Sequence, residues 1–147
     1  MGWAWQHRLM PIATSSIDHV RLTVSDIEAS RKFYEAVFGW PIYVECPENA
    51  DEATRQALWF LFGGVLYRVS DTQLVGLRPV GEDGFHEDRC GLDHLAFTVP
   101  DRAALEAAAV LLDELGVAHE PIKDLGVMAI LEFRDPDNIA LELVAHA

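Results

Sequence analysis

The chain has 147 residues, of which half are hydrophobic and about a quarter charged, as expected for one globular domain. Its formal net charge of −13, from 24 acidic and 11 basic residues, argues against nucleic acid or an anionic membrane as a partner. No apolar run reaches the ~18 residues of a membrane span, and no signal-peptide core is present, so a cytoplasmic location is expected. Cys46 and Cys90 are expected to be free thiols. Residues 1–16 are interpreted as an N-terminal extension, and the true start is either Met1 or Met10.

An internal repeat is the most informative feature of the chain. IDHVRLTVSD (17–26) returns as LDHLAFTVPD (92–101). The residues that recur in register are Asp18 and Asp93, His19 and His94, Thr23 and Thr98, and Asp26 and Asp101. Such repetition indicates two copies of one supersecondary unit.

Each copy begins with alternating apolar residues, which predict a strand with His19 or His94 on the face opposite the apolar stripe. A helix is expected to follow each strand. A capping box of Ser25 and Glu28 predicts the start of the first helix, and Gly39 its end. The second helix is expected over 102–115, before Gly116.

Short β-like runs follow each helix, at 41–46, 65–70 and 73–79 in the first copy and at 117–122, 127–133 and 139–145 in the second. An insertion at 48–64 is predicted to form an extra helix. The sequence therefore predicts an α+β fold of two tandem βαβββ modules, residues 17–80 and 92–147, joined by a polar linker at 81–91. The helices should cover the apolar faces of a mixed sheet.

Glu142 is an isolated carboxylate in an apolar terminal strand, and such a group is costly to bury unless it is paired or bound to a metal. If the modules pair pseudo-symmetrically, His19, His94 and Glu142 can converge in one concave sheet. Two imidazoles and one carboxylate suit divalent Fe, Mn, Co, Ni or Zn. Gly76 occupies the position equivalent to Glu142 and leaves room for substrate. The competing interpretations are structural histidines or a degenerate site that no longer binds metal.

The motifs IDHVRLTVSDIEASRKFYEAVFGW, GLDHLAFTVPD and FRDPDNIALELV resemble those of the vicinal oxygen chelate superfamily, over about residues 17–145. This superfamily groups glyoxalases, extradiol dioxygenases, bleomycin-resistance proteins and fosfomycin-resistance thiol transferases. The resemblance implies a cup-shaped sheet with helices outside, a central metal held by His19, His94 and Glu142, and a homodimer whose modules pair within one chain or between two. Glyoxalases and methylmalonyl-CoA epimerases of the family use a fourth ligand where this chain has Gly76, so both activities are in doubt.

Arg21 and Arg78 should line the cup and bind an anionic group of the substrate, although pairing with acids at the rim is an equally good expectation. Tyr67 is a candidate proton donor and His119 a candidate acid–base group, although packing and surface roles respectively are commoner. The aromatic residues of the insertion are candidates to wall the pocket for substrate, against the stronger expectation of packing on the sheet; they are Trp59, Phe60 and Phe62.

The leading hypothesis is thus a metal-dependent lyase, dioxygenase or transferase that chelates two neighbouring oxygens of a small, anionic substrate. The alternative is a metal-free drug-binding protein of the bleomycin-resistance type, with the acidic charge attracting cationic drugs.

Overall fold

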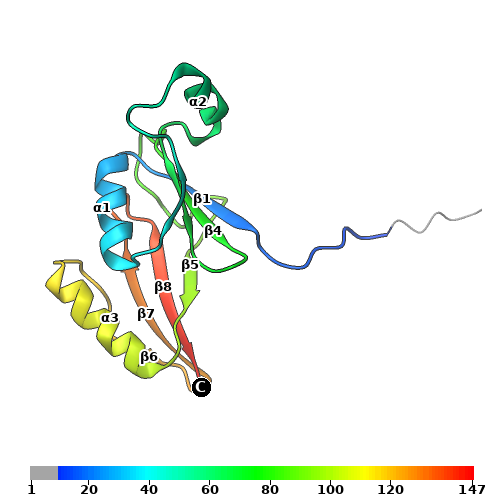
Figure 1. The fold of residues 1–147 in the computed structure, drawn as a ribbon. Coiled ribbons are helices and arrows are strands. Elements are labelled where there is room, and N and C mark those ends of the chain that lie inside the picture. Colours follow the sequence, from blue (N-terminus) through cyan, green and yellow to red (C-terminus); the bar gives the residue numbers. More distant parts are fainter. Residues whose placement is uncertain (1–9) are drawn as a thin grey trace, which may run out of the picture.

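The computed structural model describes residues 10–147, so the interpretation of the first nine residues lies outside the described part. The strands form two four-stranded sheets of identical topology, with orders β1-β4-β3-β2 and β5-β8-β7-β6. Helices α1 and α3 lie on the same side of the strands, and residues 10–16 extend from the opposite side (Figure 1). No helix among the described residues has the length and apolar character needed to cross a bilayer.

The first module contains β1 (His19–Thr23), α1 (Ile27–Val37), β2 (Ile42–Glu45), α2 (Glu52–Ala57), the 3₁₀ helix η1 (Trp59–Leu61), β3 (Val65–Arg68) and β4 (Leu74–Arg78). The second contains β5 (Leu95–Thr98), α3 (Arg102–Glu114), β6 (Lys123–Asp124), β7 (Met128–Arg134) and β8 (Ala140–His146). In each sheet the first and last strands of the module pair in parallel, and the other pairs are antiparallel. The two tandem βαβββ modules are confirmed.

The first helix begins differently from the prediction. Asp26, not Ser25, caps α1, because its carboxylate accepts from the backbone amides of Glu28 and Ala29. Ser25 instead bonds the Asp137 carboxylate through both its backbone amide and its hydroxyl, 112 residues along the chain. The helix ends as expected at Gly39, whose φ of +61° lies in the left-handed region. The capping-box prediction failed because a distant acceptor competes for the serine.

A second difference concerns the strand expected at 117–122. Only one isolated bridge, from His119 to Phe133, forms there, and the short strand β6 lies just beyond it. The insertion also divides, into α2 and η1, rather than forming one helix. Its aromatic residues therefore occupy a 3₁₀ turn and the residue after it.

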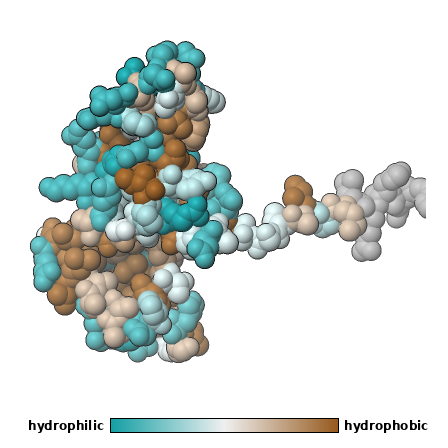
Figure 2. All heavy atoms as spheres, in the orientation of Figure 1, coloured by the Kyte–Doolittle hydropathy of each residue, from teal (hydrophilic) through white to brown (hydrophobic). Residues whose placement is uncertain are grey.

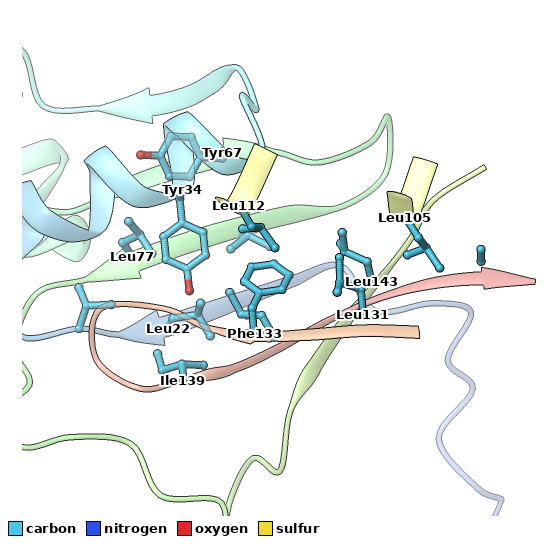
Figure 3. Close-up of a cluster of buried hydrophobic side chains, with 14 of the residues drawn as sticks. Leu22, Tyr34, Tyr67, Leu77, Leu105, Leu112, Leu131, Phe133, Ile139 and Leu143 are labelled. Atoms are coloured by element: carbon cyan, nitrogen blue, oxygen red, sulfur yellow. The ribbon is translucent and has the colours of Figure 1, made fainter. Parts of the chain in front are cut away.

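One hydrophobic core joins the two modules. Tyr34 of α1 lies near Leu22 and Leu77 of the first module and near Phe133 and Ile139 of the second (Figure 3). The buried faces carry alternate residues of every central strand, as the period of a β-strand requires. Because α1 and α3 cover these faces, the opposite face of each sheet is left for other contacts. Residues on the open face include, strand by strand, His19, Arg21 and Thr23; Leu66 and Arg68; Leu74, Gly76 and Arg78; Ala96 and Thr98; Ile130, Glu132 and Arg134; Ala140, Glu142 and Val144.

Hydrophobic and hydrophilic residues occupy different parts of the molecular surface. Hydrophobic residues gather where α1 and α3 approach each other, whereas hydrophilic residues dominate the end of the molecule that carries α2 (Figure 2). A mostly apolar pocket lies between α1 and the segment after α3, and its lining includes Phe33, Val37, Leu115 and Val117. This surface lies on the helical side, away from the open faces of the sheets.

Candidate functional site

The strand register places Gly76 and Glu142 at equivalent positions of the two modules. Gly76 pairs with Arg21 of β1, and Glu142 pairs with Ala96 of β5. The pairing is parallel in both cases, so the open faces of the two sheets present equivalent positions. In the first module the large residue of the pair, Arg21, is on the first strand and the small one is on the last. In the second module the large residue, Glu142, is on the last strand and the small one is on the first.

Each candidate metal histidine is held by the aspartate that precedes it. The Nδ1 atom of His19 lies 2.6 Å from Asp18 Oδ1, and the Nδ1 atom of His94 lies 2.5 Å from Asp93 Oδ1. An Nδ1–H that donates to a carboxylate leaves Nε2 as the lone-pair nitrogen, which is the arrangement of metal-binding histidines with a supporting carboxylate. No role was predicted for these aspartates from the sequence. Their recurrence directly before both histidines was the feature that could have indicated one.

His94 and Glu142 come together on the open face of the second sheet. His94 Nε2 lies 3.8 Å from Glu142 Oε2, and the glutamate side chain is only 14% exposed. The hydrogen bond to Asp93, together with the charge of Glu142, raises the pKa of His94 against the opposing effect of burial. An imidazole nitrogen and a carboxylate oxygen at this separation, with Nδ1 already bonded elsewhere, form a donor pair that suits a divalent transition metal.

This pair borders a cavity of about 490 Å³. Side chains of both charges line it, and Lys123 within it donates to Glu132 at 2.6 Å. Its volume falls within the range of small-molecule sites. The other residues around it include His119, Glu120 and Arg134.

His19 lies elsewhere in the single chain. Its side chain is 54% exposed, and it borders a separate cavity of about 110 Å³ with Leu95, Ala96 and Phe97 of β5. Within residues 10–147 no group of three histidine, cysteine or acidic side chains is close enough together to hold a metal. One chain thus brings together two of the three candidate ligands and presents the third on the other module.

Arg21 occupies the space that a fourth ligand would need. A Cβ atom at position 76 would overlap Leu66 Cδ2 and lie 3.0 Å from Arg21 Cγ. The Nε and Nη2 atoms of Arg21 are buried, and neither has a hydrogen-bond partner among the described residues. The first module therefore offers a guanidinium at the position where the second offers a carboxylate.

Arg78 lies two residues beyond Gly76 on the same face, and its guanidinium stacks on Phe62 at 4.3 Å from the ring centroid. Trp59 meets Phe62 edge to face at 6.1 Å. Trp59 is 69% and Phe62 46% exposed, so these rings do not pack beneath the sheet, contrary to the stronger expectation for them. Leu61 is the insertion residue that is fully buried.

Tyr67 and His119 have partners that do not suit the roles expected of them. Tyr67 is buried on the helix-covered side, where its hydroxyl donates to Glu35 of α1 at 2.8 Å, and burial followed by this bond raises its pKa. His119 borders the cavity, but Nδ1 lies 2.8 Å from the Glu120 carbonyl and Nε2 3.1 Å from Asp113. The bond to that carbonyl raises the pKa of His119 most, with Asp113 adding to it. With both nitrogens engaged, the ring has no free lone pair for a base.

Comparison with known proteins places this arrangement in a family. The model of the Glyoxalase/Bleomycin resistance protein/Dioxygenase superfamily matches residues 16–143. Lactoylglutathione lyase of Schizosaccharomyces pombe is 28% identical over 151 residues, which cover 92% of this chain and 49% of that protein. The chain therefore spans about half the length of the lyase. The uncharacterized protein YwkD of Bacillus subtilis is 30% identical over 130 residues, covering 87% of this chain and 94% of that one.

Solved structures agree with the fold. A glyoxylase/bleomycin resistance protein/dioxygenase domain from Frankia sp. EAN1pec superposes with a TM-score of 0.73 at 29% identity, covering 92% of this chain and all of that one. A fosfomycin resistance protein, FosX, from Listeria monocytogenes, solved with Mn(II) and 1S,2S-dihydroxypropylphosphonic acid, gives a TM-score of 0.71 at 17% identity over 92% and 95% of the chains. With the family model covering most of the chain and the repeated modules in place, the protein belongs to the glyoxalase/bleomycin resistance protein/dioxygenase superfamily.

Proposed function

We propose that the protein is a metal-dependent enzyme that acts on a small, oxygen-rich, anionic substrate. The observation that carries the proposal is the approach of His94 Nε2 to Glu142 Oε2 at 3.8 Å on an open sheet face, with His94 Nδ1 bonded to Asp93. A divalent metal bound there would act as a Lewis acid toward two neighbouring substrate oxygens. The superposition with a FosX that holds Mn(II) supports the choice of a divalent metal.

The third ligand in this proposal is His19 of a second copy of the chain. His19 stands on the open face of the first module with Nδ1 held by Asp18, in the same local arrangement as His94, yet it does not reach the His94–Glu142 pair within one chain. A homodimer in which the first module of one chain faces the second module of the other would supply the missing imidazole twice, through one two-fold axis.

The residues around the proposed centre favour a three-ligand site. Gly76 offers no ligand, and Arg21 and Leu66 fill the space beside it. The lactoylglutathione lyase relative supports membership of the superfamily. A first module without a carboxylate at position 76 favours the dioxygenase or transferase chemistries, which use three protein ligands, over that of a glyoxalase. Arg21 and Arg78 would orient the anionic part of the substrate on this half of the site.

Metal titration of the purified full chain tests the proposal. After treatment with EDTA, calorimetric titration with Mn²⁺, Fe²⁺, Co²⁺, Ni²⁺ or Zn²⁺ should show about one site per chain for at least one metal. His94→Ala should abolish that site with the circular dichroism spectrum unchanged, whereas His86→Ala, in the linker, should not affect it. The His86 ring is bonded to the backbone amide of Asp88 in its own loop and does not border the cavity at His94 and Glu142.

Less than about a tenth of an equivalent of every metal would contradict the proposal. In that case the drug-binding alternative makes a distinct prediction, namely a raised melting temperature with cationic antibiotics in the presence of EDTA. The two outcomes separate an enzyme from a sequestering protein even while the substrate is unidentified.

A further inference from the structure

The open face of the first sheet carries three arginines, one on each of three adjacent strands. Arg21 is on β1, Arg78 on β4 and Arg68 on β3. The register sets Arg21 beside Gly76, and Arg78 two residues further along the same strand, so their Cα atoms are diagonal neighbours on one face. The open-face positions of β1, β3 and β4 thus carry three arginines and no acidic residue, in a chain whose net charge is −13.

None of these arginines forms an ion pair with another described residue. Five other basic residues do pair with acids, at distances from 2.6 to 3.5 Å; they are Arg31, Arg89, Arg102, Lys123 and Arg134. Arg68 contacts the carbonyl of Asp71 and the ring of Tyr43. Three of the five basic residues that form no ion pair within residues 10–147 therefore lie on this one sheet face.

The unpartnered atoms of Arg21 have a specific geometry. Nε and Nη2 are the two donors on one edge of a guanidinium, and together they can bind both oxygens of a carboxylate or phosphoryl group through parallel hydrogen bonds. Leaving two buried charged donors unpaired is unfavourable by more than a neutral group would be. An acceptor that fits this edge is therefore missing from the described residues.

Arg78 is held in place by a strained residue. Phe62 has a left-handed backbone, with φ of +53°, which is uncommon for a residue with a bulky side chain. In this conformation the centroid of its ring lies 4.3 Å from the Arg78 guanidinium, and the ring meets Trp59 edge to face. Strained backbone persists where the surrounding structure supports it, commonly at ligand sites. Here it provides an aromatic surface next to the Arg78 guanidinium.

We infer that Arg21 and Arg78 form an oxyanion-binding site for a substrate that carries a carboxylate or phosphonate and an apolar, preferably aromatic, group. Arg21 binds the anion with its free edge at the position where a fourth metal ligand would otherwise stand, and Trp59 and Phe62 contact the apolar group. The placement of this site beside a metal rests on the proposed function, whereas the anion binding itself does not. A cation in place of a carboxylate at this position selects for anionic substrates.

Calorimetric titration of the full chain with phenylphosphonate and with benzoate tests the inference, in EDTA and again with saturating Mn²⁺. The two probes distinguish a phosphonate from a carboxylate substrate. Arg21→Met keeps most of the stem that packs on Gly76 and removes the charge, and it should weaken binding of the preferred probe about 10- to 100-fold. Arg78→Met should weaken it as well. Arg55→Met, which removes the same charge from exposed α2, should stay within about twofold. Benzyl alcohol, which has the ring without the charge, should not bind.

Equal affinities of wild type and Arg21→Met for both probes would overturn the inference. A second result would also overturn it, namely that Arg21→Met weakens a dimer in sedimentation velocity while anion affinity is unchanged. The acceptor of Arg21 would then belong to the second chain. If Arg21→Met does not fold, Arg21→Lys provides the test: it keeps the charge but loses the paired donors, and its affinity should fall below that of wild type while staying above that of Arg78→Met. Arg21-dependent binding in EDTA, with no metal site in any titration, would uphold this inference and reject the proposed function.

Discussion

Arg21 and Gly76 face each other in the register of the first module as Ala96 and Glu142 do in the second. The duplicated modules thus differ at these two positions: the large side chain is on the first strand of one module and on the last strand of the other. In each case the neighbour across the pair is small enough to leave it space. The asymmetry gives the open faces of the two modules opposite charge at these positions.

Introducing a carboxylate at position 76 tests this packing. Gly76→Glu should lower the free energy of unfolding by about 1–3 kcal/mol, because its Cβ would overlap Leu66 and crowd Arg21. Adding Arg21→Ala should recover part of the loss by vacating the space. Urea denaturation measures both, and Gly84→Glu, where the nearest atom to a Cβ is 3.9 Å away, serves as a control expected to change stability by less than about 0.5 kcal/mol. Equal losses at positions 76 and 84 would contradict the packing argument.

The aspartate behind His94 should contribute to metal affinity without touching the metal. Asp93→Asn removes the charged acceptor of Nδ1 while keeping the size of the side chain, and metal affinity should fall about 10- to 100-fold. Calorimetric titration with the metal that binds wild type provides the measurement. Asp71→Asn, on an exposed turn, is the matched control. An unchanged dissociation constant in Asp93→Asn would show that the imidazole needs no support.

Mixing two defective chains tests whether the metal centre spans two subunits. If the chain forms the proposed dimer, the His19→Ala and Glu142→Ala variants should each lack an intact site. After joint unfolding and refolding at equal amounts, half of the dimers are hybrids with one intact site of two, so about a quarter of the wild-type metal content should return. Metal content after gel filtration measures this recovery. Recovery that stays at zero, with hybrids demonstrated by mass spectrometry, would place all ligands in one chain.

A buried bond between the modules predicts a pH-dependent effect on stability. Tyr34 of α1 donates to Asp135 at 2.9 Å, and Asp135 also accepts from the backbone amides of Asp137 and Ile139. Burial raises the pKa of Asp135 above its usual value, and these three donors oppose the rise. A raised carboxyl pKa makes its contribution to stability greatest below the unfolded value near 3.8 and lost as pH rises through the folded value.

Tyr34→Phe removes one of the donors that lower this pKa, so the folded carboxyl should titrate at a still higher pH. The loss of stability should be about 1–3 kcal/mol at pH 7 and smaller at pH 4, where a larger fraction of Asp135 is protonated. Urea denaturation at the two pH values compares the variant with wild type. Tyr43→Phe, at a half-exposed strand position, should have no such dependence. A larger loss at pH 4 than at pH 7 would contradict the assigned direction.

Much of the fold was predictable from local patterns. The repeat of the Asp-His dipeptide, the alternation along 17–24 and 92–99, and the glycines after each helix all led to tandem βαβββ modules, because strand and helix periodicities depend on near neighbours. The equivalence of Gly76 and Glu142 also came from alignment of the repeat and is confirmed by register. The prediction that Ser25 caps the first helix was wrong because of a contact between residues far apart in the sequence. Asp137 lies beside Ser25 in space and accepts its hydrogen bonds.

For the candidate site, too, local patterns predicted some features and long-range packing decided the others. The sequence by itself determined which residue types recur at equivalent strand positions, and hence that His19, His94 and Glu142 would all project from open sheet faces, because strand period sets the direction of side chains. Only the tertiary structure decided that one chain joins His94 to Glu142 but leaves His19 apart, and that Tyr67 lies on the helix-covered side. It also decided that Arg21 takes the space beside Gly76 with two donors unpaired among the described residues. These outcomes depend on how helices and sheets pack across long sequence separations, which periodicity does not encode.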